Sequence, residues 1–440
     1  MLILSRGRNG RKIRGVYNID ALGPMWGWYN TYSKMDQLFV GDSWVRGLSA
    51  YNIPYNSFPH RYKLLLQDRF NPGGILGGYG TVRPSQMVSN TAHEVSGGTS
   101  GSLTNLSTNA PSASMLELPV NASVRVNRAY HRFNGGDANA RFLRSNVEYV
   151  DFSYANNPTS GAGTGGISAG NTGIYSLCTD ISVGSAPGTS AGGAFAATPS
   201  VNAGTAKSFT RRQSSTALTR TADHYIQVGC GSTFGGGGSA FCTNIITYDG
   251  DYTNGYGIRV HNLGSHAKTL SAWVNDSDAV AGTIGQYCLN TGHGARYAKS
   301  VCLVTGNNEA APSTVSPNRT VAQLEADQTT LLAACAAQPT TPILKIISEV
   351  MAAGTTDGWV RGSNNPADYP AMQKEFALAN NLFYIDLHEY VLGTDRQTIN
   401  SFADFCAMGW GMESDLIHPG TMGHALIAEL LFECDCYVAS

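Results

Sequence analysis

The chain of 440 residues is poor in charge. Asp, Glu, Lys and Arg make up only 14% of it, against about 25% in typical globular domains. The formal net charge is −2, and the one basic cluster lies between residues 6 and 14. We expect this cluster to be a solvated segment, with contact to a phosphate surface as the alternative. The composition therefore disfavours nucleic-acid binding.

Long apolar runs are also absent. No stretch of 18 or more apolar residues occurs, so no membrane-spanning helix is predicted. The first four residues are apolar, but the basic residues follow rather than precede them, so no secretory signal is expected. Nine cysteines without metal-ligand spacing predict neither a disulfide framework nor a metal site. We expect synthesis in a reducing cytoplasm, which leaves the place of action open.

Glycine, by contrast, is abundant, with 51 residues, which indicates many turns and strands. Residues 1–33 are basic and then aromatic, and we expect an arm that packs either on its own body or on a neighbouring subunit. Residues 34–88 show an apolar strand entering a glycine turn and then a helical pattern at residues 60–70. Length alone favours two or three structural units.

The composition changes in residues 89–266, where Ser, Thr, Gly, Asn and Ala dominate the first part. Asp180 is the only charged residue between Phe152 and Ala206. Short alternating apolar runs bounded by turn residues favour an antiparallel β-sandwich over the alternative, a disordered linker. The two interpretations compete most closely in residues 155–205.

Strands and helices alternate in residues 267–440, which predicts a parallel sheet with helices on both faces. The strand before residue 41 has the apolar character of a buried parallel strand and belongs to the same sheet. The sequence therefore predicts an α/β domain in two parts, 34–88 and 267–440. The β-sandwich of residues 89–266 would be an insertion in that domain.

Three short motifs carry residue types that acyl transfer needs: Gly-Asp-Ser at 41–43, Gly-Asn-Asn-Glu at 306–309, and Asp-Leu-Ile-His-Pro at 415–419. They supply a hydroxyl, a polar amide, and a histidine with a carboxylate to orient it. Each has a structural alternative: a helix cap for the first, an Asx-turn for the second and a capped turn for the third. In a parallel sheet such groups gather at the carboxyl ends of strands.

Together the motifs resemble the SGNH (GDSL-like) hydrolase family over residues 34–88 and 267–440. Trp44 stands where leucine is common in the first block, and Glu309 replaces the usual Asp of the third. The resemblance implies a flavodoxin-like α/β fold. It also implies Ser43 as nucleophile, His418 as general base and Asp415 as the group that orients it.

The resemblance further implies an oxyanion hole made of the Ser43 amide, the Asn308 side chain and a glycine amide. That glycine should lie in residues 73–81, where Gly78 is favoured and Gly77 and Gly80 are alternatives. No metal or organic cofactor is implied. His388, next to Asp386, is a competing candidate for the base. Trp44, Trp359 and Trp410 either line a pocket or pack in the core.

Residues 245–273 are similar to SGNH proteins with an inserted jelly-roll-like β-domain, many of them bacteriophage tail proteins. His261 and Asn262 would then be structural or rim residues at the return to the hydrolase core. The resemblance implies a serine esterase. The polar, charge-poor β-rich segment favours surface glycans, so the first expected substrate is an O-acetyl ester on a cell-envelope polysaccharide. The aromatic N-terminal segment and the resemblance to tail proteins favour contact with a host cell surface and a homotrimer or larger virion assembly. The alternatives are a receptor-binding adhesin with a vestigial hydrolase domain, and a lipid or thioester hydrolase.

Overall fold

A computed structural model describes the α/β part of the chain and the backbone of the strands between residues 80 and 248. Among the candidate site residues named above, Gly77, Gly78, Trp359 and Asp415 lie outside the described residues. The described α/β segments are residues 13–30, 35–50, 56–70, 258–262, 264, 269–274, 298–310, 319–351, 367–393, 401–414 and 417–437.

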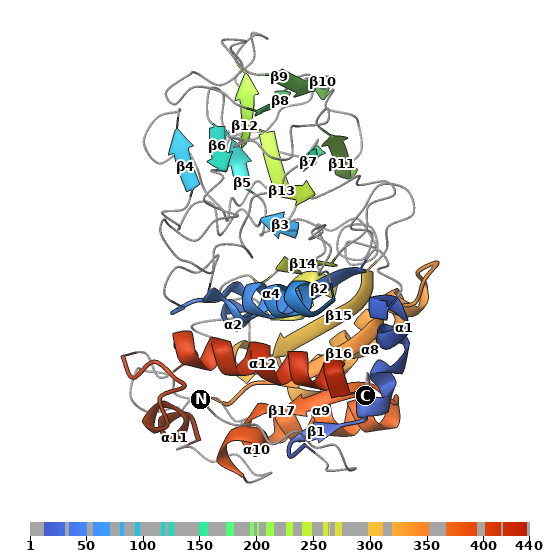
Figure 1. Cartoon of the computed structure of the whole chain (residues 1–440), viewed down its shortest axis with the longest axis vertical. Coiled ribbons are helices and arrows are strands. Elements are labelled where there is room, and N and C mark those ends of the chain that lie inside the picture. The colour runs from blue at the N-terminus through green and yellow to red at the C-terminus, as the bar shows by residue number, and fades with distance from the viewer. Residues whose placement is uncertain are drawn as a thin grey trace.

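A mostly parallel six-stranded sheet forms the centre of the α/β part (Figure 1). Neighbouring strands are parallel except for the first pair, which is antiparallel. Every residue of β2 is buried, as expected of a strand covered on both faces. The strands, in spatial order, are β1 (Val16–Tyr17), β17 (Phe383–Asp386), β16 (Ile343–Ser348), β15 (Ala298–Thr305), β2 (Met35–Gly41) and β14 (Ile258–Asn262).

Helices cover both faces of this sheet, because alternate strand residues enter two separate cores. Leu38 and Val40 pack with α6 (Ser271–Val274), α8 (Val321–Ala336) and α9 (Asp368–Ala379). The opposite face packs against α1 (Gly23–Asn30), α4 (Phe58–Phe70), α11 (Ser401–Ala407) and α12 (Thr421–Tyr437). The predicted α/β class, with helices on both faces, is confirmed.

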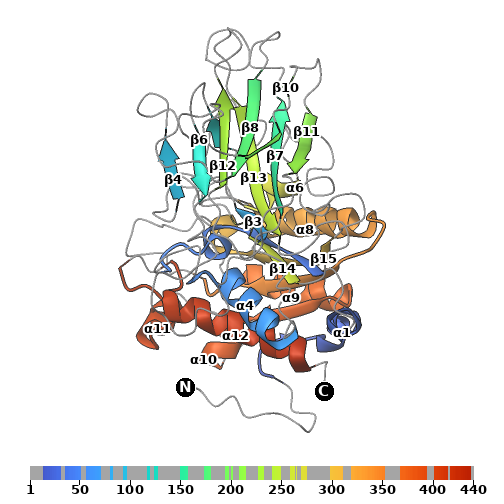
Figure 2. The same ribbon diagram turned by 45° about the horizontal axis from the view of Figure 1, so that its top comes forward.

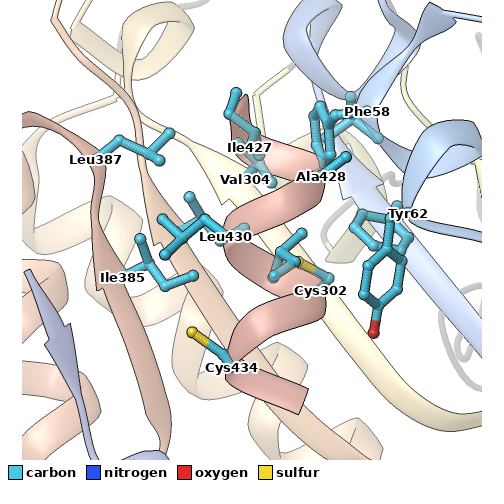
Figure 3. Packing of buried hydrophobic residues seen from close by; sticks show 14 of the residues in the cluster. Phe58, Tyr62, Cys302, Val304, Ile385, Leu387, Ile427, Ala428, Leu430 and Cys434 are labelled. Carbon is cyan, nitrogen blue, oxygen red and sulfur yellow. The ribbon is translucent and has the colours of Figure 1, made fainter. Parts of the chain in front are cut away.

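Helix α12 lies along the second face and supplies much of its core. Figure 3 shows Ile427, Ala428 and Leu430 of this helix among side chains from α4 and from the strands. Buried polar contacts fix the other end of α12, where Lys345 of β16 donates to Asp435 over 2.9 Å. The helix that follows the third motif is therefore tied to the sheet along its length.

Residues 13–30 pack on the chain's own body, one of the two contacts expected for the N-terminal segment. Strand β1 extends the central sheet beside β17, and 3-10 helix η1 (Ile19–Leu22) leads into α1. Tyr29 of α1 stacks on Phe70 with ring centroids 4.5 Å apart, and its hydroxyl donates to Asp435 over 2.8 Å. This segment is thus part of the α/β layers.

Strands β3 to β13 form two antiparallel sheets, which Figure 2 shows above the helices and strands of the α/β part. One has the order β10-β8-β12-β6-β4 with β9 beside β8, and the other β11-β7-β13-β3 with β5 beside β13. The strands are β3 (Gly80–Val82), β4 (His93–Ser96), β5 (Leu116–Leu118), β6 (Ser123–Val126), β7 (Tyr149–Asn156), β8 (Gly173–Thr179), β9 (Ala194–Ala197), β10 (Ser200–Val201), β11 (Ser208–Ser214), β12 (Ile226–Gly231) and β13 (Ala240–Tyr248).

Strand pairing divides the chain at slightly different places from composition. Strand β3 lies within residues 34–88 but pairs with β13 in an antiparallel sheet. Strand β14 lies within residues 89–266 but pairs with β2 in the central sheet. Composition follows the content of Ser, Thr and Gly, whereas pairing follows hydrogen bonds between distant segments, so the two need not change at the same residue. The inserted domain and its boundaries stay predictions.

Ion pairs across the sheet edge join β14 to β2. Arg259 donates to both carboxylate oxygens of Asp36, at 2.8 and 3.0 Å. The His261 ring nitrogen Nε2 lies 2.9 Å from the same carboxylate, and all three side chains are buried. His261 thus has a structural contact within the sheet, in agreement with the role expected for it.

Gly41, at the end of β2, has no space for a side chain, because a Cβ there would lie 2.2 Å from the carbonyl oxygen of Val304. We expect Gly41→Ala to lower the free energy of unfolding by about 1–3 kcal/mol or more, measured by urea denaturation. Gly27→Ala is the matched control, since nothing lies within 4 Å of a Cβ in that exposed helical position. Equal stability of the Gly41 variant and wild type would contradict this account of the strand end.

Candidate active site

The first motif forms a tight turn from β2 into helix α2 (Ser43–Arg46). Asp42 is the N-cap of this helix, and its Oδ1 accepts from the Trp44 amide over 2.8 Å. The helix-cap alternative for Asp42 is therefore correct as far as it goes. It does not exclude a chemical role for Ser43, which occupies the first helical position and is only 3% exposed.

His418 lies directly against this serine. Its Nε2 is 2.8 Å from Ser43 Oγ, across 375 residues of sequence. With Nδ1 protonated, Nε2 is free to accept the serine proton, which is the geometry that a general base requires. Asp415 lies outside the described residues. The structure therefore brings together two of the three predicted catalytic side chains.

The loop that carries His418 is held by hydrogen bonds to the backbone of His418 and of the residues around it in the sequence. The His418 carbonyl accepts from Met412 N over 2.9 Å, and Gly420 N donates to the Trp410 carbonyl over 2.8 Å. The indole Nε1 of Trp44 donates to the Ile417 carbonyl over 2.8 Å. One hydrogen bond thus joins the helix that begins with the serine to the loop of the histidine.

Of the three tryptophans considered for a pocket, Trp44 is fully buried. Its ring packs against both Phe402 and Phe405 of α11, with centroids 6.1 and 6.2 Å away. Trp410 is partly buried and packs against the same core cluster. For Trp44 the structure selects core packing, because the indole nitrogen points to a backbone carbonyl and the ring to aromatic neighbours.

The second motif follows β15, the strand next to β2. Gly41 and Val304 are partners in the register, so both strands end at the same edge of the sheet. Helix α7 (Asn307–Ala310) begins directly after Gly306, and Asn308 is only 6% exposed. Ser43 and Asn308 therefore leave the sheet from adjacent carboxyl ends, where an oxyanion donor is required.

Glu309, which replaces the usual Asp of the third block, closes this turn with both carboxylate oxygens. Oε1 accepts from Leu270 N over 2.8 Å and Oε2 from Gly306 N over 2.9 Å. Burial raises the pKa of Glu309 to about 7, and the charge of Asp42 contributes to the rise. The two backbone donors act in the opposite direction.

Two more buried carboxyl groups, those of Asp42 and Glu349, interact with each other next to the serine turn. Burial raises the pKa of Asp42 to about 6, while the Trp44 amide, Glu349 and His418 oppose the rise. Burial and the charge of Asp42 hold the pKa of Glu349 well above its usual range. Sequence reasoning missed Glu349. The signal that could have found it is its position directly after the buried strand β16.

The competing histidine, His388, is engaged elsewhere. Its Nε2 lies 2.9 Å from Ser401 Oγ, and both side chains are buried between α10 (Leu387–Leu392) and α11. This second serine–histidine contact joins two helices. His418, not His388, is the histidine on Ser43.

His424 is another buried histidine that the motifs did not indicate. Its Nδ1 accepts from Phe58 N over 3.4 Å, which leaves Nε2–H to donate to the Leu48 carbonyl over 3.3 Å. Burial lowers the pKa of His424 to about 3, so the ring is neutral. Since Leu48 closely follows α2, His424 ties the start of α12 to the serine segment.

The chain's return from the β-rich sheets also contacts α2. Asn262 Nδ2 donates to the Val45 carbonyl over 2.8 Å, and Gly264 N donates to Asn262 Oδ1 over 3.0 Å. A Cβ on Gly264 would lie 2.1 Å from Arg46 N. Asn262 therefore positions the helix that begins with Ser43, which is a structural role.

No helix among the described residues is long and apolar enough to cross a membrane. Within the same part of the chain, no group of three or more His, Cys, Asp or Glu side chains could hold a metal ion.

No protein-family model and no curated protein matches the chain. Among solved structures it is similar to a peptidoglycan O-acetylesterase, with 15% identity, a TM-score of 0.56 and 94% of each chain covered. This likeness extends over the central sheet and the β-rich sheets alike, and it shows the fold.

Two further solved structures are less similar. A family two carbohydrate esterase from Clostridium thermocellum has 11% identity and a TM-score of 0.27, with 78% of this chain and 98% of that chain covered. A lipase/acylhydrolase from Enterococcus faecalis has 16% identity and a TM-score of 0.29, with 40% and 75% covered. The likeness to the peptidoglycan O-acetylesterase bears on the fold alone.

The bond from Trp44 to the Ile417 carbonyl can be removed with little change of shape. We expect Trp44→Phe to lower the free energy of unfolding by about 1–3 kcal/mol, because a partly buried carbonyl loses its donor and the core loses ring area. Denaturant unfolding would measure this. Trp26→Phe is the control, since the half-buried Trp26 packs edge-on against Phe70, away from the histidine loop. An equal loss in both variants would contradict a special role for Trp44.

Proposed function

We propose that the protein is a serine ester hydrolase. The observation that carries the proposal is the 2.8 Å contact between His418 Nε2 and Ser43 Oγ at the carboxyl edge of the parallel sheet. His418 takes the proton of Ser43 Oγ as the oxygen attacks the acyl carbon, and then gives it to the leaving alcohol. Water, activated by the same ring, releases the acyl group from the serine.

Three other groups complete the proposed site. Asp415 accepts from His418 Nδ1, which selects the tautomer and stabilises the imidazolium. The Ser43 amide, the Asn308 side chain and the Gly78 amide bind the oxyanion. Asn308 is supported by its position after β15, next to the strand that leads to Ser43. Asp415 and Gly78 rest on the family resemblance. This chemistry requires no metal or organic cofactor.

The proposed substrate is an O-acetyl ester on a cell-envelope polysaccharide. The whole-chain likeness to a peptidoglycan O-acetylesterase supports it. So does the polar composition of the β-rich segment, since glycans are recognised largely by neutral hydrogen-bonding groups. By the resemblance to tail proteins, we place the protein on a bacteriophage virion, as a homotrimer or larger assembly at the host cell surface.

Removal of the nucleophile should abolish the activity. We expect Ser43→Ala to lose hydrolysis of p-nitrophenyl acetate and of acetylated polysaccharide, and to lose covalent labelling by a fluorophosphonate. Ser401→Ala is the matched control, because it breaks the other serine–histidine contact and should keep both signals.

The same assay separates the rival functions. Full activity in the Ser43 variant would end the proposal. A wild-type protein that neither labels nor hydrolyses any ester would indicate an adhesin with a vestigial hydrolase domain. Preference for long acyl chains or thioesters over acetylated glycan would replace the substrate while keeping the chemistry.

The oxyanion role of Asn308 predicts a partial loss. We expect Asn308→Ala to lower kcat by roughly 10²–10³, because one donor to the developing negative charge is removed. Steady-state kinetics on the acetyl ester would measure it, with KM little changed. Asn380→Ala is the control, since this amide only caps α9 by donating to the Phe376 carbonyl. A loss below about threefold in kcat would remove Asn308 from the oxyanion hole.

A further inference from the structure

Glu349 lies at the meeting point of three strand ends. It directly follows β16, and between β16 and β2 in the sheet lies β15. Its side chain lies beside Gly306 at the end of β15. A Cβ on Gly306 would lie 3.5 Å from Glu349 Oε2 and 3.9 Å from its Cβ. The carboxyl of Glu349 can therefore cross the end of β15 towards the turn that carries Ser43.

This carboxyl has partners on both catalytic loops. Glu349 Oε2 accepts from Asn307 N over 2.6 Å, next to the proposed oxyanion residue Asn308. The Asn307 side chain also donates to the Val350 carbonyl over 3.2 Å, which holds the same two segments together. On the other side, the Glu349 carboxyl interacts with that of Asp42, whose buried Oδ2 has no other hydrogen-bond partner among the described residues. Asp42 is the N-cap of the helix that begins with Ser43.

A hydrogen bond between two carboxyl groups requires a proton on one of them. Asp42 Oδ1 already accepts from the Trp44 amide, and the charge of His418 favours the ionised form of Asp42. Glu349 faces two other carboxyl groups, those of Asp42 and Glu309, and burial together with their charges holds its pKa well above its usual range, whereas the contact with Glu349 opposes the rise in the pKa of Asp42. The proton therefore resides on Glu349 and the negative charge on Asp42.

We propose that Glu349 is a positioning residue of the active site and acts as a neutral carboxylic acid. It donates to Asp42 and accepts from Asn307 N, and so fixes the turn of the nucleophile relative to the turn of the oxyanion donor. The inference rests on the proposed function of Ser43 and Asn308. Its physical basis is that a misplacement of about 1 Å between such groups can cost about 10² in rate.

The hydrogen bonds that Glu349 makes to Asp42 and Asn307 N depend on pH, and the direction of that dependence follows from the groups around Glu349. The titratable groups that face it are Asp42, Glu309 and, through Asp42, His418, with Asp386 at the end of the adjacent strand β17. Ionised Glu349 would repel Asp42 and could no longer donate to it. Because its pKa is higher in the folded than in the unfolded chain, its stabilising effect is full at low pH and is lost as pH rises.

Substitution of Glu349 by glutamine or by alanine separates the effect of its hydrogen bonds to Asp42 and Asn307 N from the effect of its ionisation. Glu349→Gln keeps a donor for Asp42 and an acceptor for Asn307 N, and never ionises. At neutral pH we expect Glu349→Gln to keep kcat within about threefold of wild type, and Glu349→Ala to lose about tenfold or more. At alkaline pH we expect kcat of wild type to fall as Glu349 ionises, and kcat of Glu349→Gln to show no such fall. The control is Glu375→Gln, on the exposed face of α9. The proposal is wrong if glutamine is as damaging as alanine, or if its pH profile matches that of wild type.

A second measurement needs no enzymatic activity. The melting temperature of Glu349→Gln relative to wild type should rise between about pH 5 and about pH 8, because in wild type the unfolded chain ionises this residue over that range while the folded chain keeps it protonated, which favours unfolding. Glu375→Gln should show no such trend. A difference that stays flat or falls with pH would overturn the neutral-acid assignment. If wild type hydrolyses no ester, the proposed function fails, and the melting series still decides the state of Glu349.

Discussion

The parallel pairing of β2 with β15 is the constraint on which the site depends. It sets Gly41 opposite Val304, so that the segments following β2 and β15 leave the sheet at the same edge. The nucleophile turn and the asparagine turn both begin there, although an entire set of β-rich strands separates them in sequence. Gly41 permits this approach because it has no side chain to strike the Val304 carbonyl.

Around that edge the chain uses polar groups where a core would normally be apolar. Asp42, Glu309 and Glu349 are all buried there, and backbone amides of Trp44, Leu270, Gly306 and Asn307 donate to them. Burial of several acids is costly unless donors or protons neutralise them. The loops that hold the reactive serine are thus fixed by directional bonds, which pin geometry more closely than apolar packing does.

The α/β class, the two-sided sheet and the Ser43–His418 contact were predictable, because long periodic segments and specific motifs carry them. Other features were not. Trp44 reads equally as pocket or core until its neighbours Phe402 and Phe405 are known, and both are hundreds of residues away in sequence. Glu349 belongs to no motif, and its role comes from a strand order that periodicity does not reveal. The sheets to which β3 and β14 belong are set by hydrogen bonding and not by composition. The segment boundaries drawn from composition therefore differ from those drawn from strand pairing.

The separation of Ser43 and His418 by 375 residues has a consequence for biosynthesis. A ribosome-bound chain exposes the serine long before the histidine is made, so the nascent protein has the proposed nucleophile without its proposed base. Such distant contacts also slow folding, because a long loop must close before they form. The contact between Ser43 and His418 therefore forms only in chains that have been synthesised past His418 and have folded.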